Sequence, residues 1–102
     1  MNTAEKVNAN SVWTASKNTV SCEVEGEMVL LDLQSGTYFG LNAVGAEIWN
    51  QITRHKSFAE IQHHLLGQYR VTPEQCEEEV LSLMTKLTEK GLVKSGNDES
   101  AS

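Results

Sequence analysis

The sequence predicts an α+β fold in which a three- to four-stranded antiparallel sheet is followed by three α-helices. Two observations support this expectation. In the first half of the chain, apolar residues alternate within short runs separated by turn residues, as they do in half-buried strands. In the second half they recur every three or four positions, which is the spacing of amphipathic helices. We expect one domain over residues 12–94, between flexible polar tails at 1–11 and 95–102.

The predicted strands are short runs of β-favouring residues bounded by polar or glycine turns. They span residues 12–16, 19–24, 28–33 and 37–41. The turns between them contain Lys17-Asn18, Glu25-Gly26 and Gln34-Ser35-Gly36. Connections this short join antiparallel neighbours, and the alternation of Val29, Leu31 and Leu33 gives the third strand one apolar face.

The three helices are predicted from apolar residues that share one helical face. The three sets are Val44, Ile48 and Ile52, then Phe58, Ile61 and Leu65, then Cys76, Val80, Leu83 and Leu87. The expected N-terminal caps are Asn42, Ser57 with Glu60, and Thr72-Pro73 with Gln75. Gly91 is expected to end the third helix, and Leu92-Val93 to add a brief final strand.

Four segments together resemble the PqqD-like family, the small leader-peptide-binding proteins of ribosomally made, modified peptide pathways, also called RiPP recognition elements. The segments are LLDLQSGTYFGLN, VGAEIW, SFAEIQHHL and VTPEQCEEEVLSLMTKLTEKGLV. The resemblance covers residues 20–94. It implies a winged helix-turn-helix arrangement, which agrees with the predicted order of a small sheet followed by three helices.

The charge and the termini exclude several functions. The net charge of -6 opposes association with phosphate backbones and anionic lipid, so we expect neither nucleic acid nor membrane as a partner. The N-terminus lacks the apolar core of a signal peptide, and no stretch is apolar enough to span a bilayer. A cytoplasmic location is expected, with Cys22 and Cys76 as reduced thiols.

A catalytic or metal site is not predicted. His63 and His64 are adjacent, so on a helix they point about 100° apart and cannot share a metal as an i, i+4 pair can. Glu60 with His63 is half of a di-metal motif whose second copy is missing. Glu60 fits the capping box instead, and the histidines, His55 included, fit a solvated surface. We therefore expect no enzyme activity, no cofactor and no metal.

The hairpin strand is the candidate binding edge. An edge strand leaves backbone N–H and C=O groups unpaired, so an extended peptide can add to the sheet. The candidate residues of this strand are Thr37, Tyr38, Phe39, Gly40 and Leu41. Gly40 lets another backbone approach closely, while Phe39 and Leu41 are expected to point into the core.

The third helix carries one apolar arc and one leucine outside it. The arc contains Cys76, Val80, Leu83, Met84 and Leu87. Leu81 falls outside this arc, so either the buried face is broad or Leu81 lines a groove. The resemblance implies a leader peptide held antiparallel to the hairpin strand, against Cys76, Val80, Leu81, Met84 and Leu87. Arg70 is our candidate for contacting acidic leader residues.

The expected function is to bind the leader of a precursor peptide and to present it to a separate maturation enzyme. The resemblance favours the leader protease and cyclase of lasso-peptide biosynthesis, with a radical SAM maturase as the alternative. A winged-helix DNA-binding regulator is the rival from another class. The charge of the third helix argues against DNA binding, because the carboxylates of this helix outnumber its basic residues, Lys86 and Lys90. A homodimer is a further alternative, because a free edge strand can also pair with a second copy of the chain.

Overall fold

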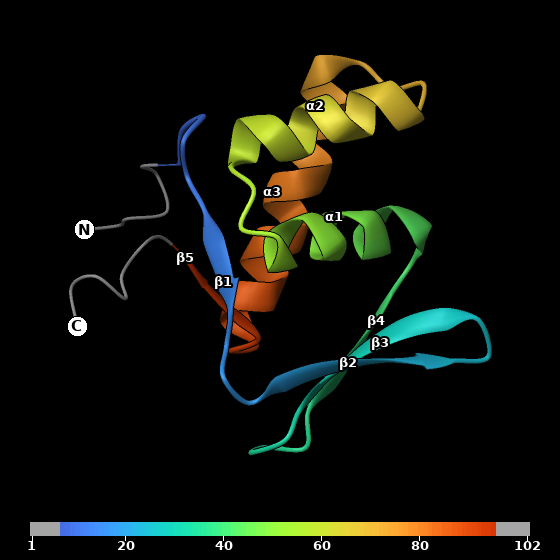
Figure 1. Cartoon of the computed structure of the whole chain (residues 1–102), viewed down its shortest axis with the longest axis vertical. Coiled ribbons are helices and arrows are strands. Elements are labelled where there is room, and N and C mark those ends of the chain that lie inside the picture. The colour runs from blue at the N-terminus through green and yellow to red at the C-terminus, as the bar shows by residue number, and fades with distance from the viewer. Residues whose placement is uncertain (1–6, 96–102) are drawn as a thin grey trace.

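The computed structural model describes residues 7–95, which form two small antiparallel sheets and three helices (Figure 1). The elements in chain order are β1 (Trp13–Ala15), β2 (Thr19–Val24), β3 (Glu27–Asp32), β4 (Tyr38–Leu41), α1 (Ala43–Thr53), α2 (Phe58–Gln68), α3 (Pro73–Glu89) and β5 (Val93–Ser95). The predicted α+β class and the three helices are confirmed. The tails expected at residues 1–6 and 96–102 lie outside the described residues.

The strands form two sheets, whereas one sheet of three to four strands was expected. β2, β3 and β4 form a meander in that order, whereas β1 leaves it and pairs with β5. The pairing sets Thr14 opposite Lys94, far away along the chain. The predicted final strand is therefore confirmed, and its role is to hold the start of the domain next to its end.

Turn geometry fixes the register of the meander. Glu25 and Gly26 both have positive φ, 53° and 85°, as a two-residue hairpin turn of the favoured twist requires. At the other turn, Gly36 has φ 80° and donates its N–H to the Asp32 carbonyl at 2.8 Å. The Asp32 N–H then donates to the Thr37 carbonyl at 2.8 Å, which starts the β3–β4 ladder.

Helix ends follow the predicted caps. The Asn42 side chain accepts from the Gly45 N–H at 2.8 Å. Both capping boxes are present, one formed by Ser57 with Glu60 and the other by Thr72 with Gln75. Gly91, with φ 74°, follows α3 in the left-handed conformation that commonly ends a helix.

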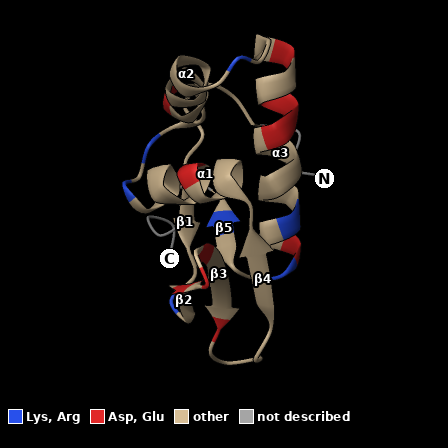
Figure 2. Cartoon of the chain, turned by 90° about the vertical axis from the view of Figure 1, so that its right-hand side faces the viewer, with Lys and Arg blue, Asp and Glu red and all other residues tan. Residues whose placement is uncertain are grey.

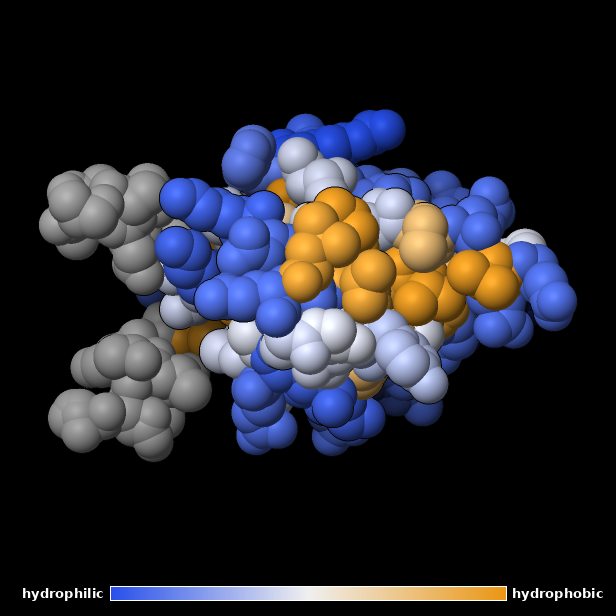
Figure 3. Space-filling model, turned by 90° about the horizontal axis from the view of Figure 1, so that it is seen from below, coloured by the Kyte–Doolittle hydropathy of each residue, from blue (hydrophilic) through white to orange (hydrophobic). Residues whose placement is uncertain are grey.

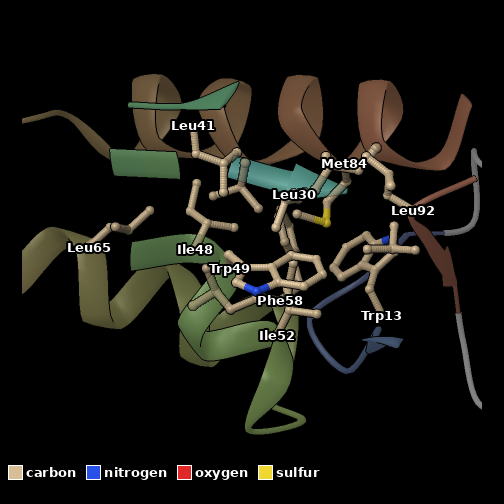
Figure 4. Packing of buried hydrophobic residues seen from close by; sticks show 14 of the residues in the cluster. Trp13, Leu30, Leu41, Ile48, Trp49, Ile52, Phe58, Leu65, Met84 and Leu92 are labelled. Carbon is tan, nitrogen blue, oxygen red and sulfur yellow. The ribbon is translucent and has the colours of Figure 1, made fainter. Parts of the chain in front are cut away.

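The core lies between the sheets and the helices (Figure 4). Trp13 meets Phe58 edge to face, with ring centroids 6.0 Å apart, so the first strand is packed onto α2. Leu30 and Leu41 enter the core from the meander. From α3 the buried residues are Cys76, Val80, Met84 and Leu87.

Residues before the predicted domain start also contact the rest of the structure. The Phe58 N–H donates to the Ser11 carbonyl at 2.8 Å, and the Ala59 N–H donates to the Ala9 carbonyl at 3.1 Å. Val7 packs against the core. Residues 7–11 were expected in the N-terminal tail, but they supply acceptors to the first turn of α2, where backbone donors lack partners within the helix.

None of the helices between residues 7 and 95 is both long and apolar enough to cross a membrane.

Candidate functional site

β4 is an edge strand. Within residues 7–95 it pairs with β3 alone. The bond from Asp32 to Thr37 and the pairing of Leu30 with Phe39 place the main chain of Phe39 toward β3. Because hydrogen-bonding direction alternates along an antiparallel strand, the N–H and C=O groups of Tyr38 and Gly40 point away from the sheet. These groups are available to another strand.

The side chains of β4 divide between the two faces of the sheet. Leu41 is buried in the core, as predicted, and Phe39 is half-buried against it. Tyr38 is 72% exposed on the opposite face. A Cβ at Gly40 would meet no atom within 4 Å, so the strand is open at this position.

A groove of about 240 Å³ separates β4 from α3. Figure 2 shows the two elements side by side, with α1 across the upper end of β4. The β4 side and the start of α1 contribute Phe39, Gly40, Leu41, Asn42, Gly45 and Ile48. The α3 side contributes Glu79, Ser82, Leu83 and Lys86. A second, more polar hollow continues the groove along α3 past Asn42, Gln75 and Glu78. The unpaired edge of β4 therefore lies beside a continuous channel.

The residues of α3 that were expected to touch a peptide lie elsewhere. Cys76, Val80, Met84 and Leu87 are at most 2% exposed, because they form the stripe that packs into the core. Leu81 does line a hollow, of about 410 Å³, but that hollow lies on the other flank of α3, beside Trp13 and Met84. The face of α3 that lines the groove is therefore the neighbouring one, which includes Leu83.

Arg70 is exposed in the connection between α2 and α3 and is not among the residues that line the groove. The basic residues beside the groove are instead Lys86 and Lys90. Lys86 lines it directly, and the Lys90 Nζ lies 5.9 Å from the centroid of the Phe39 ring. Sequence reasoning missed these residues. Their signal was the spacing of Glu79, Leu83, Lys86 and Lys90 along one helical face.

The thiol of Cys76 in α3 is buried and is a weak nucleophile. Cys76 is buried, and its Sγ lies 3.7 Å from the Gln62 carbonyl. Burial, with the Glu79 carboxylate adding to it, raises the pKa of the Cys76 thiol. A raised pKa keeps the thiol protonated and weakens it as a nucleophile.

The carboxylate and histidines of α2 have structural partners. Glu60 accepts the Ser57 N–H at 2.7 Å, and this hydrogen bond is the main reason that the pKa of Glu60 is lowered. His64 was expected on a solvated surface, but it is half-buried and its Nε2 lies 2.8 Å from the Glu47 carboxylate of α1. No three His, Cys, Asp or Glu side chains of residues 7–95 are grouped so as to bind a metal ion.

A further apolar surface lies on the outer face of the meander, which points away from the helices (Figure 3). Val20 pairs with Leu31, which pairs in turn with Tyr38, so the three side chains lie side by side on this face. Val24 and Leu33 are also more than half exposed. Apolar patches of this kind on soluble domains commonly contact other proteins.

Comparison with known proteins agrees with this geometry. The family described as Coenzyme PQQ synthesis protein D (PqqD) matches residues 27–93, which include the meander, the groove and all three helices. The chain belongs to the PqqD family. A search of curated proteins gave no match.

Two solved structures resemble this PqqD-family domain closely. One is described as TbiB1 in complex with the TbiA(beta) leader peptide; it shares 36% identity with a TM-score of 0.73, over 78% of this chain and 93% of that chain. The other is described as lasso peptide synthetase B1 complexed with the leader peptide; it shares 28% identity with a TM-score of 0.74, over 79% of this chain and 95% of that chain.

Proposed function

We propose that this protein binds the leader segment of a ribosomally made precursor peptide by adding it as a strand to β4. The observation that carries the proposal is the free edge at Tyr38 and Gly40 beside the groove between β4 and α3. Main-chain pairing to that edge gives affinity that depends little on sequence, and pockets for alternate side chains give selectivity. Two similar proteins, whose structures contain leader peptides, support the proposal.

The apolar contacts that we propose come from both walls of the groove. Phe39 lies half-buried on the β4 side, and Leu83 lies half-buried on the α3 side. An apolar leader side chain between them would lose water-exposed surface at about 25 cal/mol per Å². Four of the residues predicted on α3, Cys76, Val80, Met84 and Leu87, are already buried in the core and act there as structural support, whereas Leu81 lines the hollow on the other flank.

We also propose that the protein is not itself an enzyme but presents the leader to a separate maturation enzyme. The lasso-peptide protease and cyclase are the favoured partners, because one similar structure is described as lasso peptide synthetase B1 and both contain a leader peptide. A radical SAM peptide maturase is the alternative, supported by the family description. The exposed apolar face of the meander is a suitable surface for such a partner, because it lies away from the groove.

The test is a fluorescence anisotropy titration. The probe is a labelled synthetic peptide with the leader sequence of the precursor encoded beside this gene. Saturable binding that changes little with added salt is expected, because pairing of main chains and apolar contacts releases few counterions. No binding, or preferential binding of duplex DNA with a steep salt dependence, would overturn the proposal in favour of the DNA-binding alternative or an unrelated role.

A further inference from the structure

The groove is charged unequally along its length. On the α3 wall, Glu78 and Glu79 lie toward the start of the helix, and Lys86 and Lys90 lie toward its end. Figure 2 shows most of the acidic segments of α3 in its upper half, beyond the upper end of β4, and its basic segment in the lower half, beside β4. We infer that the groove selects a peptide whose basic residues come before its acidic residues. This inference rests on the proposed function and specifies the peptide's charge order.

The contacts fix which end of β4 meets which charge. Phe39, near the start of β4, lies under Lys90, with 5.9 Å between the Nζ and the ring centroid. Asn42, just after β4, lines the hollow that contains Glu78 and Glu79, while Lys86 lines both this hollow and the groove beside Phe39. β4 therefore runs from the basic end of the groove to its acidic end, opposite to α3.

The direction of the added strand follows from the sheet. The meander is antiparallel throughout, and antiparallel pairing is slightly more stable per residue than parallel pairing. A peptide added antiparallel to β4 starts beside Leu41 and ends beside Tyr38. Its N-terminal part then faces Glu78 and Glu79, and its C-terminal part faces Lys86 and Lys90.

The spacing of the preferred charges can be calculated. A helix rises about 1.5 Å per residue, so Glu79 lies about 10 Å along the axis from Lys86 and about 16 Å from Lys90. A strand advances about 3.4 Å per residue, so these distances correspond to roughly three to five peptide residues. Because alternate side chains face the helix, we expect the basic and acidic residues to be about four positions apart.

These charges are available to a ligand. Within the described part of the chain, the ion pair found is that of His64 with Glu47, and neither residue lines the groove or the hollow that continues it. Glu78, Glu79 and Lys86 are all exposed. Complementary charges on a peptide would therefore fix its register and direction more than they raise its total affinity.

The test uses the full chain and two sets of labelled peptides derived from the leader sequence of the adjacent precursor. One set carries lysine about four residues before glutamate, and the other carries the two in reverse order, at each register along the paired segment. At low salt the best lysine-first peptide should bind about threefold or more tightly than the best reversed peptide. The difference should shrink at about 1 M salt, where the Debye length is roughly 3 Å.

A charge exchange in the protein provides the matched test. The double variant Glu79→Lys with Lys86→Glu keeps the net charge and should abolish the preference, because the exchanged charges are then offset by Glu78 at one end and by Lys90 at the other. The control Glu77→Lys with Lys94→Glu makes the same exchange at exposed positions outside the groove lining and should leave the preference unchanged. Equal binding of both peptide orders to the unaltered protein, or a glutamate-first preference, overturns the inference and leaves strand addition standing. Absence of binding by every peptide, the unaltered leader included, overturns the proposed function itself.

Discussion

The ammonium of Lys90 lies over the ring of Phe39, 5.9 Å from its centroid, and so joins the C-terminal end of α3 to the edge strand β4. A contact of this kind at a partly exposed site contributes about 0.5–1 kcal/mol. It places a positive charge beside Phe39, which lines the groove. The same ring is therefore both a wall of the groove and the support for one of its charges.

The first prediction concerns the outward main chain of β4. Tyr38→Pro removes an N–H that points away from β3, and proline is tolerated on the free side of an edge strand. The fold should survive while leader binding falls by at least about tenfold, the loss of about 1.4 kcal/mol expected for a missing main-chain bond. Anisotropy measures the binding, and circular dichroism measures the fold.

Two variants control for position on that strand. Tyr38→Val keeps the N–H and the β preference, so it should bind the leader nearly as well as the unaltered protein. Phe39→Pro removes an N–H that faces β3, so it should disrupt the meander itself. Normal leader binding by Tyr38→Pro would exclude strand addition at this edge.

The second prediction separates the two flanks of α3. Leu83 lines the groove, whereas Leu81 lines the hollow beside Trp13, and both leucines are half-buried. Leu83→Ala should weaken leader binding about tenfold, because it removes apolar surface from the groove wall. Leu81→Ala should leave the affinity unchanged. The opposite result in the same titration would restore the flank that the sequence suggested.

The third prediction compares two helical glycines. A Cβ at Gly67 of α2 would meet no atom within 4 Å, so Gly67→Ala should stabilise the domain by up to about 1 kcal/mol. A Cβ at Gly45 of α1 would lie 3.2 Å from the Leu41 Cδ2, so Gly45→Ala should gain less and should displace Leu41 at the groove. Thermal unfolding of both variants tests this, and equal stabilisation would show that the contact at Gly45 is not restrictive.

The fourth prediction concerns pH. The pKa of Glu60 is lowered chiefly by the hydrogen bond from the Ser57 N–H, so its ionised form is favoured by folding. This contribution is complete above the unfolded-state pKa, about 4.3, and is lost as the pH falls through the lower folded-state value. Glu60→Gln should therefore lower the melting temperature near pH 7 and match the unaltered protein in acid. A constant difference at all pH values would mean that the charge of Glu60 is not involved.

Local signals in the sequence predicted the helix ends well. Asn42, Ser57 and Gly91 act on backbone groups within a few residues of themselves, so their roles depend little on the rest of the fold. The turn at Gly36 was predicted for the same reason. These residues position β4 and the start of α1, and therefore one wall of the groove.

The α3 wall of the groove was not predicted, because its position depends on contacts between segments that are far apart in the sequence. Leu81 and Leu83 flank the same buried stripe, and no local signal states which flank faces β4. That choice is set by how α3 packs against α1 and the meander. Local sequence does not predict the pairing of β1 with β5 either, because each strand is only three residues long and the two lie at opposite ends of the domain. The sequence predicted the edge strand but not the helical face opposite it.

The most direct measurement is amide hydrogen exchange, followed by NMR, of the protein with and without the leader peptide. Strand addition to β4 predicts that the amides of Tyr38 and Gly40 become protected when the peptide binds. The outward amides of Ser21 and Glu23, on the opposite edge at β2, should be unchanged and serve as the internal control. Protection at Ser21 and Glu23, or binding without protection at Tyr38 and Gly40, would contradict the account.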